Sequence, residues 1–245
     1  MNNKKRNDGR ALNELRNIEI IPGFLKNCSG SAVISFGNTR VLCAASVSTD
    51  LPPWMRSENA SGGWVTAEYQ MLPASTVPRG RRPTKGPNGR SQEIQRLIGR
   101  SLRAAVDLEK LGPRMVNIDC DVLDADGGTR CASICGAMVA LQLALAPLIA
   151  SGELEENPVV NKIAAVSVGK VEEDIVLDLC YEEDSRAEVD MNVVMTENGE
   201  FIELQGTAEG NPFLKSELSD MLDMAEKGIR EIIQIQNKVI AEAGA

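Results

Sequence analysis

Apolar and polar residues alternate in several short segments of this chain, with the two-residue period of a β-strand. In residues 116–123, for example, Val116, Ile118 and Cys120 fall on one face and mostly polar side chains fall on the other. Patterns of this kind predict strands over residues 18–21, 31–36, 40–47, 64–71, 116–123, 162–171, 174–179, 191–195 and 201–205. Neighbouring strands are separated in two places by pairs typical of tight antiparallel hairpins, Gly37-Asn38 and Asn198-Gly199.

Longer segments carry apolar residues at the three- and four-residue spacing of a helix. They are residues 92–110, an apolar segment that ends at Leu148, and residues 214–240. Loops are expected where Pro, Gly or charged residues gather, at residues 50–63, 74–91 and 152–158. This order of elements predicts an α/β fold (α+β with a mixed sheet), in which much of the sheet is antiparallel and helices pack on it.

The chain of 245 residues is long enough for one large domain or two small ones. The polar, acidic stretch at 152–158 is the best internal boundary. We expect a single domain over residues 1–245, with an N-terminal half at 1–151 and a C-terminal half at 159–245.

The amino-acid composition indicates in which cellular compartment the protein works. A hydrophobic content of 43% is ordinary for a soluble globular protein. We expect no apolar run of the ~18–20 residues that span a membrane, and no hydrophobic segment of a secretory signal follows the charged N-terminus. The six cysteines include no CxxC pair and lie mostly in apolar segments, which suits a reducing compartment. We therefore expect a cytoplasmic protein without a membrane partner.

The chain contains no histidine. This excludes Ser-His-Asp and Cys-His triads, His-ligated zinc and histidine general bases. Catalysis would have to use carboxylates, Arg or Lys, backbone donors or a bound metal. Aromatic residues make up only 3%, so stacking of bases on an aromatic platform is not expected either.

Positive charge is concentrated in one segment of an acidic chain. The net charge is -9, but residues 79–103 hold eight basic residues and one acidic residue, Glu93. The basic residues are Arg79, Arg81, Arg82, Lys85, Arg90, Arg96, Arg100 and Arg103. Such a segment is typical of a local polyanion contact. The alternative is a solvated helix face, at Arg96, Arg100 and Arg103, next to a mobile loop.

A Gly-rich turn joins the predicted strand at 116–123 to the following helix. Its sequence, from Asp124 to Arg130, is DADGGTR. Backbone N–H groups and the helix dipole point at one place in such a turn, and glycines allow an anion to approach closely. Thr129 adds a hydroxyl, and Arg130 adds donors that match phosphate. The alternative is a tight turn with a surface Arg. Neither a Walker-type GxxxxGK[ST] motif nor a GxGxxG motif is present.

Asp184 and Asp190 flank a short polar stretch in which the chain could fold back. Two converging carboxylates would suit Mg²⁺ or Mn²⁺, which completes its coordination with water or substrate phosphates. The alternative is a solvated acidic loop. A phosphate site, a basic segment and a carboxylate pair together indicate chemistry at a phosphodiester, driven by electrostatics.

Six segments resemble those of the bacterial ribonuclease PH family. They are 36–43 (FGNTRVLC), 63–69 (GWVTAEY), 89–103 (GRSQEIQRLIGRSLR), 119–130 (DCDVLDADGGTR), 183–196 (EDSRAEVDMNVVMT) and 205–210 (QGTAEG). The resemblance extends over residues 6–240. Within it, the loop between Met71 and Arg90 is shorter than the family pattern, and Ala74 stands where an Arg is expected.

The resemblance implies a ribosomal protein S5 domain 2-like fold, assembled as a homohexamer that is a trimer of dimers. It implies a phosphorolytic 3′→5′ exoribonuclease, which uses inorganic phosphate to trim the 3′ ends of tRNA precursors and other RNA, and which releases nucleoside diphosphates. The alternatives are a non-catalytic, exosome-like ring or RNA-binding subunit and a hydrolytic nuclease.

The resemblance also implies roles for particular residues. Phosphate binding falls on Arg90, Gly128, Thr129 and Arg130. Catalysis falls on Asp184 and Asp190, which hold Mg²⁺ or Mn²⁺, together with Arg130. RNA binding falls on Arg79 and Arg82, and we expect Arg96 and Arg100 to help guide the RNA tail.

Overall fold

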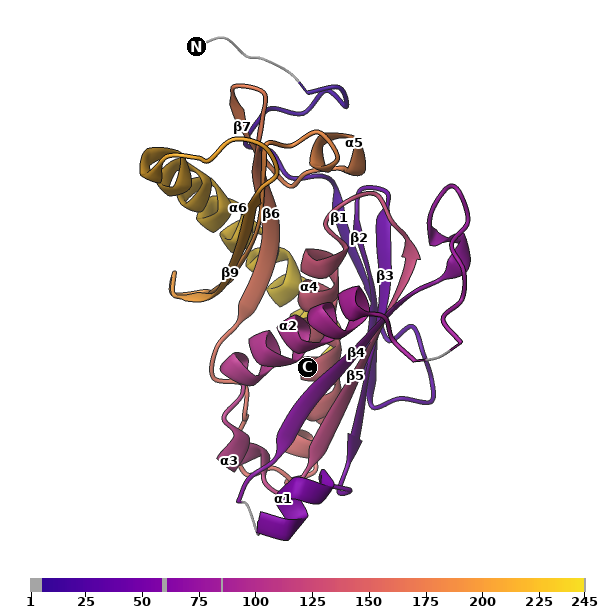
Figure 1. Ribbon diagram of the computed structural model, residues 1–245. Helices are drawn as coiled ribbons and strands as arrows, with labels where there is room; N and C mark the ends of the chain where they lie inside the picture. Colours follow the sequence, from indigo (N-terminus) through magenta and orange to yellow (C-terminus); the bar gives the residue numbers. More distant parts are fainter. Residues whose placement is uncertain (1–5, 59–60, 85, 245) are drawn as a thin grey trace.

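The structure is a computed structural model that describes residues 6–58, 61–84 and 86–244. Within this part of the chain, two β-sheets pack against a long central helix (Figure 1). The first sheet has five strands in the order β1-β2-β3-β5-β4, and only β4 and β5 are parallel. Its strands are β1 (Ile18–Pro22), β2 (Gly30–Phe36), β3 (Thr39–Ser48), β4 (Trp64–Met71) and β5 (Met115–Asp124).

The second sheet has four antiparallel strands in the order β7-β6-β8-β9. They are β6 (Ile163–Val171), β7 (Asp174–Leu177), β8 (Val189–Thr196) and β9 (Phe201–Ala208). Gly37 and Gly199 turn the two predicted hairpins with positive φ angles of 55° and 86°. Each predicted strand is present, and the predicted mixed α/β fold with largely antiparallel pairing is confirmed.

Helix α4 (Thr129–Ala150) packs against β2 and β3 of the first sheet and against β6 of the second. A helix that is apolar on all sides is stable in water only when it is buried in this way. The prediction that no apolar run reaches membrane-spanning length was wrong, because α4 has 22 residues and is apolar enough to cross a membrane. Since 67% of its most apolar window is buried inside the protein, α4 is accounted for as a core helix.

The helix predicted over 92–110 is divided in two. Helix α2 (Gly89–Ala105) begins where the Asn88 side chain accepts a hydrogen bond from the Ser91 N–H, and it ends before Val106. Val106 is extended and pairs with Val159 as an isolated β-bridge. Asp107 then caps a second, short helix, α3 (Leu108–Leu111), by accepting two backbone N–H bonds. The prediction missed that this cap favours a new helix start over a continuous helix.

Short helices also form in two segments for which no helix was predicted. Helix α1 (Pro53–Glu58) interrupts the predicted loop at 50–63, with a proline at its start, where proline suits a helix. Helix α5 (Tyr181–Asp184) occupies the acidic segment before β8. In the predicted loop at 74–91, a 3₁₀ turn, η1 (Pro73–Ser75), is followed by irregular chain over residues 76–84 and 86–88.

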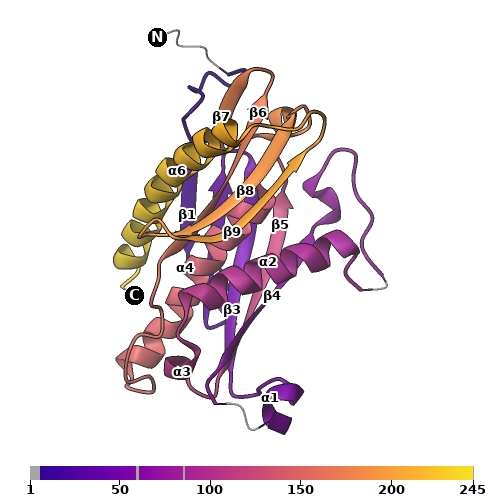
Figure 2. The same ribbon diagram turned by 60° about the vertical axis from the view of Figure 1, so that its left-hand side comes forward.

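Helix α6 (Lys215–Glu242) covers the second sheet and also contacts β1 of the first (Figure 2). Buried side chains of both sheets and of α2, α4 and α6 belong to one hydrophobic cluster. The N-terminal end of α4 and the segments on either side of α5 thereby meet at the border between the two sheets.

Candidate active site

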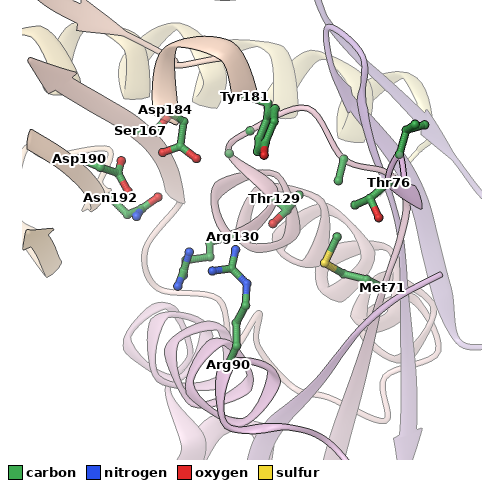
Figure 3. A pocket seen from close by; sticks show the side chains of 14 residues that line it. Met71, Thr76, Arg90, Thr129, Arg130, Ser167, Tyr181, Asp184, Asp190 and Asn192 are labelled. Carbon is green, nitrogen blue, oxygen red and sulfur yellow. The ribbon is translucent and has the colours of Figure 1, made fainter. Parts of the chain in front are cut away.

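A cavity of about 430 Å³ lies where the start of α4 faces α5 and β8 (Figure 3). A second cavity of about 460 Å³ adjoins it, because the two have several lining residues in common. The shared residues are Arg90, Arg130, Asp184, Asp190 and Asn192. Both predicted phosphate-binding arginines and both predicted catalytic aspartates are therefore brought together in one cleft.

The Gly-rich turn before α4 forms one end of this cleft. Gly127 and Gly128 adopt positive φ angles of 76° and 66°, a region that favours glycine, and Gly128 is the N-cap of α4. A Cβ on Gly127 would lie 2.6 Å from the Leu179 carbonyl oxygen, and one on Gly128 would lie 2.9 Å from Arg16 Nη2. The glycines were predicted to make room for an anion, but the space beside their Cα atoms is occupied by the protein. Gly128 and Thr129 nevertheless line the cavity.

Arg130 lies in the first turn of α4, and Glu93 of α2 holds its guanidinium group. Its Nη2 donates to Glu93 Oε2 at 2.9 Å, and Gln205 Nε2 donates to Glu93 Oε1 at 2.9 Å. Burial would raise the pKa of Glu93, but the hydrogen bonds from Arg130 and Gln205 outweigh it and lower this pKa. Glu93 is thus an anion that orients the guanidinium. The sequence signalled Glu93 only as the single acid among basic residues, and it gave no sign of Gln205.

Asp184 ends α5 and Asp190 lies in β8, and the turn between them brings both carboxylates to the cleft. Burial raises the pKa of both groups. At Asp190 the negative charge of Asp184 acts in the same direction, and the pKa reaches about 6 although Arg130 and Arg90 oppose the rise. In Figure 3 the two carboxylates face the guanidinium groups of Arg90 and Arg130 across the cleft. The solvated acidic loop, the alternative interpretation, does not describe these two residues.

The donor set suits a hard divalent cation. Two oxygen-bearing side chains that repel each other become compatible when a cation lies between them. Among the described residues, no cluster of three or more His, Cys, Asp or Glu side chains is placed to hold a metal. Mg²⁺ and Mn²⁺ do not require one, because one or two carboxylates, water and substrate phosphates complete their coordination. Asp184 and Asp190 therefore fit such an ion.

The arginines predicted to bind RNA lie outside the residues that line the cleft. Arg79 is exposed and donates to its neighbour's carbonyl, Gly80 O, at 3.0 Å. Arg82 lies near the carboxylate of Asp121 and opposes the rise of its pKa that burial causes. Lys85, in the same basic loop, lies outside the described residues.

The basic face predicted along α2 is partly used within the protein. Arg100 Nη1 pairs with Glu203 Oε2 at 2.7 Å. Arg103 stacks 4.5 Å from the ring centre of Trp64 and donates to the Val65 carbonyl oxygen at 2.9 Å. Arg96 is exposed. The three arginines therefore do not form one continuous free surface.

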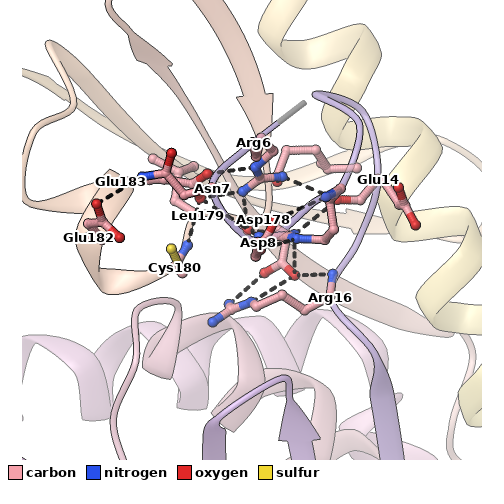
Figure 4. Close-up of polar contacts among 12 residues, drawn as sticks. Arg6, Asn7, Asp8, Glu14, Arg16, Asp178, Leu179, Cys180, Glu182 and Glu183 are labelled. Carbon is pink, nitrogen blue, oxygen red and sulfur yellow. Dashed lines mark hydrogen bonds and ion pairs between the residues drawn. The ribbon is translucent and has the colours of Figure 1, made fainter. Parts of the chain in front are cut away.

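An N-terminal arm, residues 6–16, makes polar contacts with the segment from Asp178 to Glu183 (Figure 4). Arg6 pairs with Glu183, the residue before Asp184, and Arg16 Nη2 pairs with Asp178 Oδ1 at 2.6 Å. Arg16 Nη1 also donates to the Asp126 carbonyl oxygen in the Gly-rich turn, at 2.6 Å. Arg6, Arg16 and Asp178 are all buried. These buried contacts anchor the arm, although Asn7, Asp8 and Gly9 between its arginines are exposed; residues 1–5 lie outside the described chain.

Comparison with known proteins defines the class. A model described as "3' exoribonuclease family, domain 1" matches residues 14–147, and one described as "3' exoribonuclease family, domain 2" matches residues 161–228. Two solved structures share the fold. They are an Archaeoglobus fulgidus exosome with RNA bound to the active site (TM-score 0.78, 23% identity, 94% of this chain and 92% of that one) and rice Rrp46 (TM-score 0.76, 18% identity, 96% and 100%).

Sequence relatives narrow this class further. Proteins named ribonuclease PH are 54% identical in Neisseria meningitidis serogroup C (236 residues, 96% of this chain and 97% of the relative), in Corynebacterium glutamicum strain R (235 residues, 95% and 95%) and in Bacillus pumilus (238 residues, 96% and 98%). The chain belongs to the ribonuclease PH family.

Proposed function

We propose that this chain is a phosphorolytic 3′→5′ exoribonuclease. It removes nucleotides from the 3′ ends of tRNA precursors, with inorganic phosphate as the attacking group and nucleoside diphosphates as products. One observation carries the proposal: Arg90 in the first turn of α2 and Arg130 in the first turn of α4 face two half-buried aspartates across a single cleft. That arrangement suits a phosphodiester and an attacking phosphate, which both carry negative charge.

Arg90, Arg130 and the start of α4 would hold the attacking phosphate. Guanidinium groups form paired, charge-assisted hydrogen bonds with phosphate oxygens. The positive end of the helix dipole adds to this attraction, with Gly128 and Thr129 at its first turn. Glu93 keeps the Arg130 guanidinium in one orientation, so this side chain loses little conformational freedom when phosphate binds.

Asp184 and Asp190 would hold Mg²⁺ or Mn²⁺. When bound, such an ion neutralises charge that accumulates on the phosphoryl oxygens and on the leaving 3′-oxygen. The aspartates would hold the positive charge of the ion on the side of the cleft opposite Arg90 and Arg130. Positive charges would then flank the reacting phosphate from both sides of the cleft. The ionised form of the aspartates is needed for this role.

The RNA tail would be guided by basic residues at some distance from the cleft. Arg79 and Arg82 lie on an exposed loop and Arg96 on an exposed face of α2, positions from which they can reach the backbone of a single strand. Arg100 would exchange Glu203 for a phosphate, since exposed ion pairs of this kind are weak. We further propose a homohexamer, a trimer of dimers, in the cytoplasm; the free state of all six cysteines supports a reducing compartment.

One assay separates the candidate functions. RNA with a single-stranded 3′ extension is incubated with the protein and Mg²⁺, with and without inorganic phosphate, and the released nucleotides are identified. Phosphate-dependent release of nucleoside diphosphates is expected. Nucleoside monophosphates would indicate a hydrolase, and the absence of any release would indicate a non-catalytic ring subunit. The non-catalytic alternative is less well supported, because Arg130, Asp184 and Asp190 meet in one cleft.

A further inference from the structure

Two buried hydroxyl groups meet at the phosphate end of the cleft. Tyr69 Oη and Thr129 Oγ1 are 2.9 Å apart. Tyr69 belongs to β4 and is 1% exposed, whereas Thr129 opens α4 and is 7% exposed. Thr129 lines the first of the two cavities beside Gly128, and Tyr69 is not among the lining residues. Tyr69 therefore acts on the cleft through the hydroxyl of Thr129.

The direction of this hydrogen bond decides what Thr129 offers to the cleft. Each hydroxyl carries one proton, and the bond between them uses one of the two. If Thr129 donates, its oxygen presents only lone pairs to the cleft, and the phenolic proton of Tyr69 has no acceptor among the described residues. If Tyr69 donates, the Thr129 proton is free to point into the cleft. An anion is repelled by the first arrangement and bound by the second.

The surroundings favour Tyr69 as the donor. Burial raises the pKa of Tyr69, although the hydrogen bond with Thr129 and the charges of Arg90 and Arg130 act in the opposite direction. The phenol thus keeps its proton at neutral pH. The side chain of Thr129 is β-branched and therefore stiff, so its hydroxyl stays beside the phenol and the cleft. Neither hydroxyl has another hydrogen-bond partner within the described chain.

We propose that Tyr69 is a positioning residue for the attacking phosphate: it donates its proton to Thr129 and so commits the Thr129 proton to a phosphate oxygen. This inference rests on the proposed function, because it assigns a donor within the phosphate site. The expected effect is a kinetic one. Loss of the phenolic hydroxyl weakens the use of phosphate, while the aspartates and the RNA contacts keep their geometry.

The first test is the substitution Tyr69→Phe, which removes one oxygen atom and keeps the ring in the core. Initial rates are measured against phosphate at saturating RNA and against RNA at saturating phosphate. The KM for phosphate is expected to rise about three- to tenfold, the range for one lost hydrogen bond, while the KM for RNA and kcat change less than about twofold. The matched control is Ser101→Ala, which removes another buried hydroxyl, bonded to Leu97 O on α2 at 2.9 Å. It should leave the KM for phosphate unchanged.

A double-mutant cycle separates positioning from general packing. Thr129→Val keeps the branched shape and removes the hydroxyl through which Tyr69 is proposed to act. In that background Tyr69→Phe should have almost no further effect on the KM for phosphate. Equal effects in the two backgrounds would show that Tyr69 acts through packing, and an unchanged KM in the single variant would also overturn the inference.

Phosphate binding gives a readout that does not depend on turnover. The rise in Tm on titration with inorganic phosphate yields an apparent Kd for each variant. The Kd should increase in Tyr69→Phe by the same factor as the KM, and a Kd equal to that of the unaltered protein would overturn the inference. If the unaltered protein binds phosphate and shows no phosphate-dependent turnover, the proposed function fails instead, and the Kd comparison still decides the role of Tyr69.

Discussion

At the scale of single residues, two effects oppose the ionisation of Asp190. Burial and the charge of Asp184 raise its pKa from 3.8 to about 6. The folded state then binds this proton more tightly than the unfolded state, so the contribution of Asp190 to stability is fully present below pH 3.8 and is lost as the pH rises through about 6. Without a cation, the ionised pair strains the fold at neutral pH.

Asp190→Asn should therefore stabilise the metal-free protein at pH 8 by about 1–3 kcal/mol, and much less at pH 4. Urea unfolding at both pH values, in the presence of a chelator, measures the difference. Asp124→Asn is a matched control, because Asp124 is exposed and pairs with Arg40 at the surface. A stability gain that does not depend on pH would contradict the raised pKa.

The same substitution should nearly abolish turnover. Asn lacks the charge that holds a divalent ion and balances the arginines, and loss of one electrostatic stabiliser commonly lowers kcat about 100- to 1,000-fold. Phosphorolysis rates of Asp190→Asn, with its circular dichroism spectrum as a check on folding, test this role. Retained turnover would remove Asp190 from the reaction.

Arg130 presents one guanidinium to two anionic partners, Glu93 and the proposed phosphate. Arg130→Ala should weaken the use of phosphate by about 1.5–3 kcal/mol, the contribution of a hydrogen bond to a charged group. The KM for phosphate measures this loss. Arg40→Ala, which removes an exposed arginine from the surface pair with Asp124, should not change it. The phosphate site would be refuted by an unchanged phosphate dependence in Arg130→Ala.

At the scale of elements, the basic loop between η1 and α2 carries the proposed RNA contacts. Each phosphate contact on a single strand contributes about 0.7 to the slope of log K against log salt concentration. Replacing Arg79 and Arg82 together by Ala should therefore flatten this slope by about 1.4 if both contact RNA. RNA binding measured at several salt concentrations tests it. Arg230→Ala on α6, which removes an exposed arginine paired with Glu226, is the control, and an unaltered slope in the loop variant would exclude the loop.

Two regions of helix differ from what the hydrophobic pattern of the sequence predicted. Asn88 and Asp107, nineteen positions apart, each cap a helix, and that spacing divides the predicted helix at Val106. Helix α1 has only six residues, too few to show a helical period, and buried Met55 and the Trp54–Trp64 ring contact join it to the protein. Side-chain caps decided the first case, and tertiary contacts of Met55 and Trp54 accompany the second.

At the scale of the whole molecule, a buried ion pair joins the two sheets. Arg16 precedes β1 of the first sheet, whereas Asp178 follows β7 of the second, and the same arginine binds the Gly-rich turn of the cleft. Removing one member leaves a buried charge without its partner. Both sheets should respond to the loss, since they share one hydrophobic cluster.

Asp178→Asn should lower the free energy of unfolding by about 3–5 kcal/mol in one cooperative transition. The experiment is urea unfolding followed by tryptophan fluorescence and by far-UV circular dichroism. Both tryptophans, Trp54 and Trp64, belong to the N-terminal half, so fluorescence reports there on a change made in the C-terminal half. Coincident curves with a common shift are expected. Two separate transitions, or a fluorescence curve that does not move, would show that the halves unfold independently.

The sequence by itself determined the strands, both hairpins, the central apolar helix and the main charged residues of the cleft, because alternation, turn residues and charge are local properties of the chain. Only the tertiary structure decided that Tyr69 lies beside Thr129, that Gln205 and Glu93 hold Arg130, and that the arginines of the N-terminal arm are buried. These contacts join residues 37 to 177 positions apart. Their energies depend on burial and on partners from other elements, and no local pattern in the chain records either.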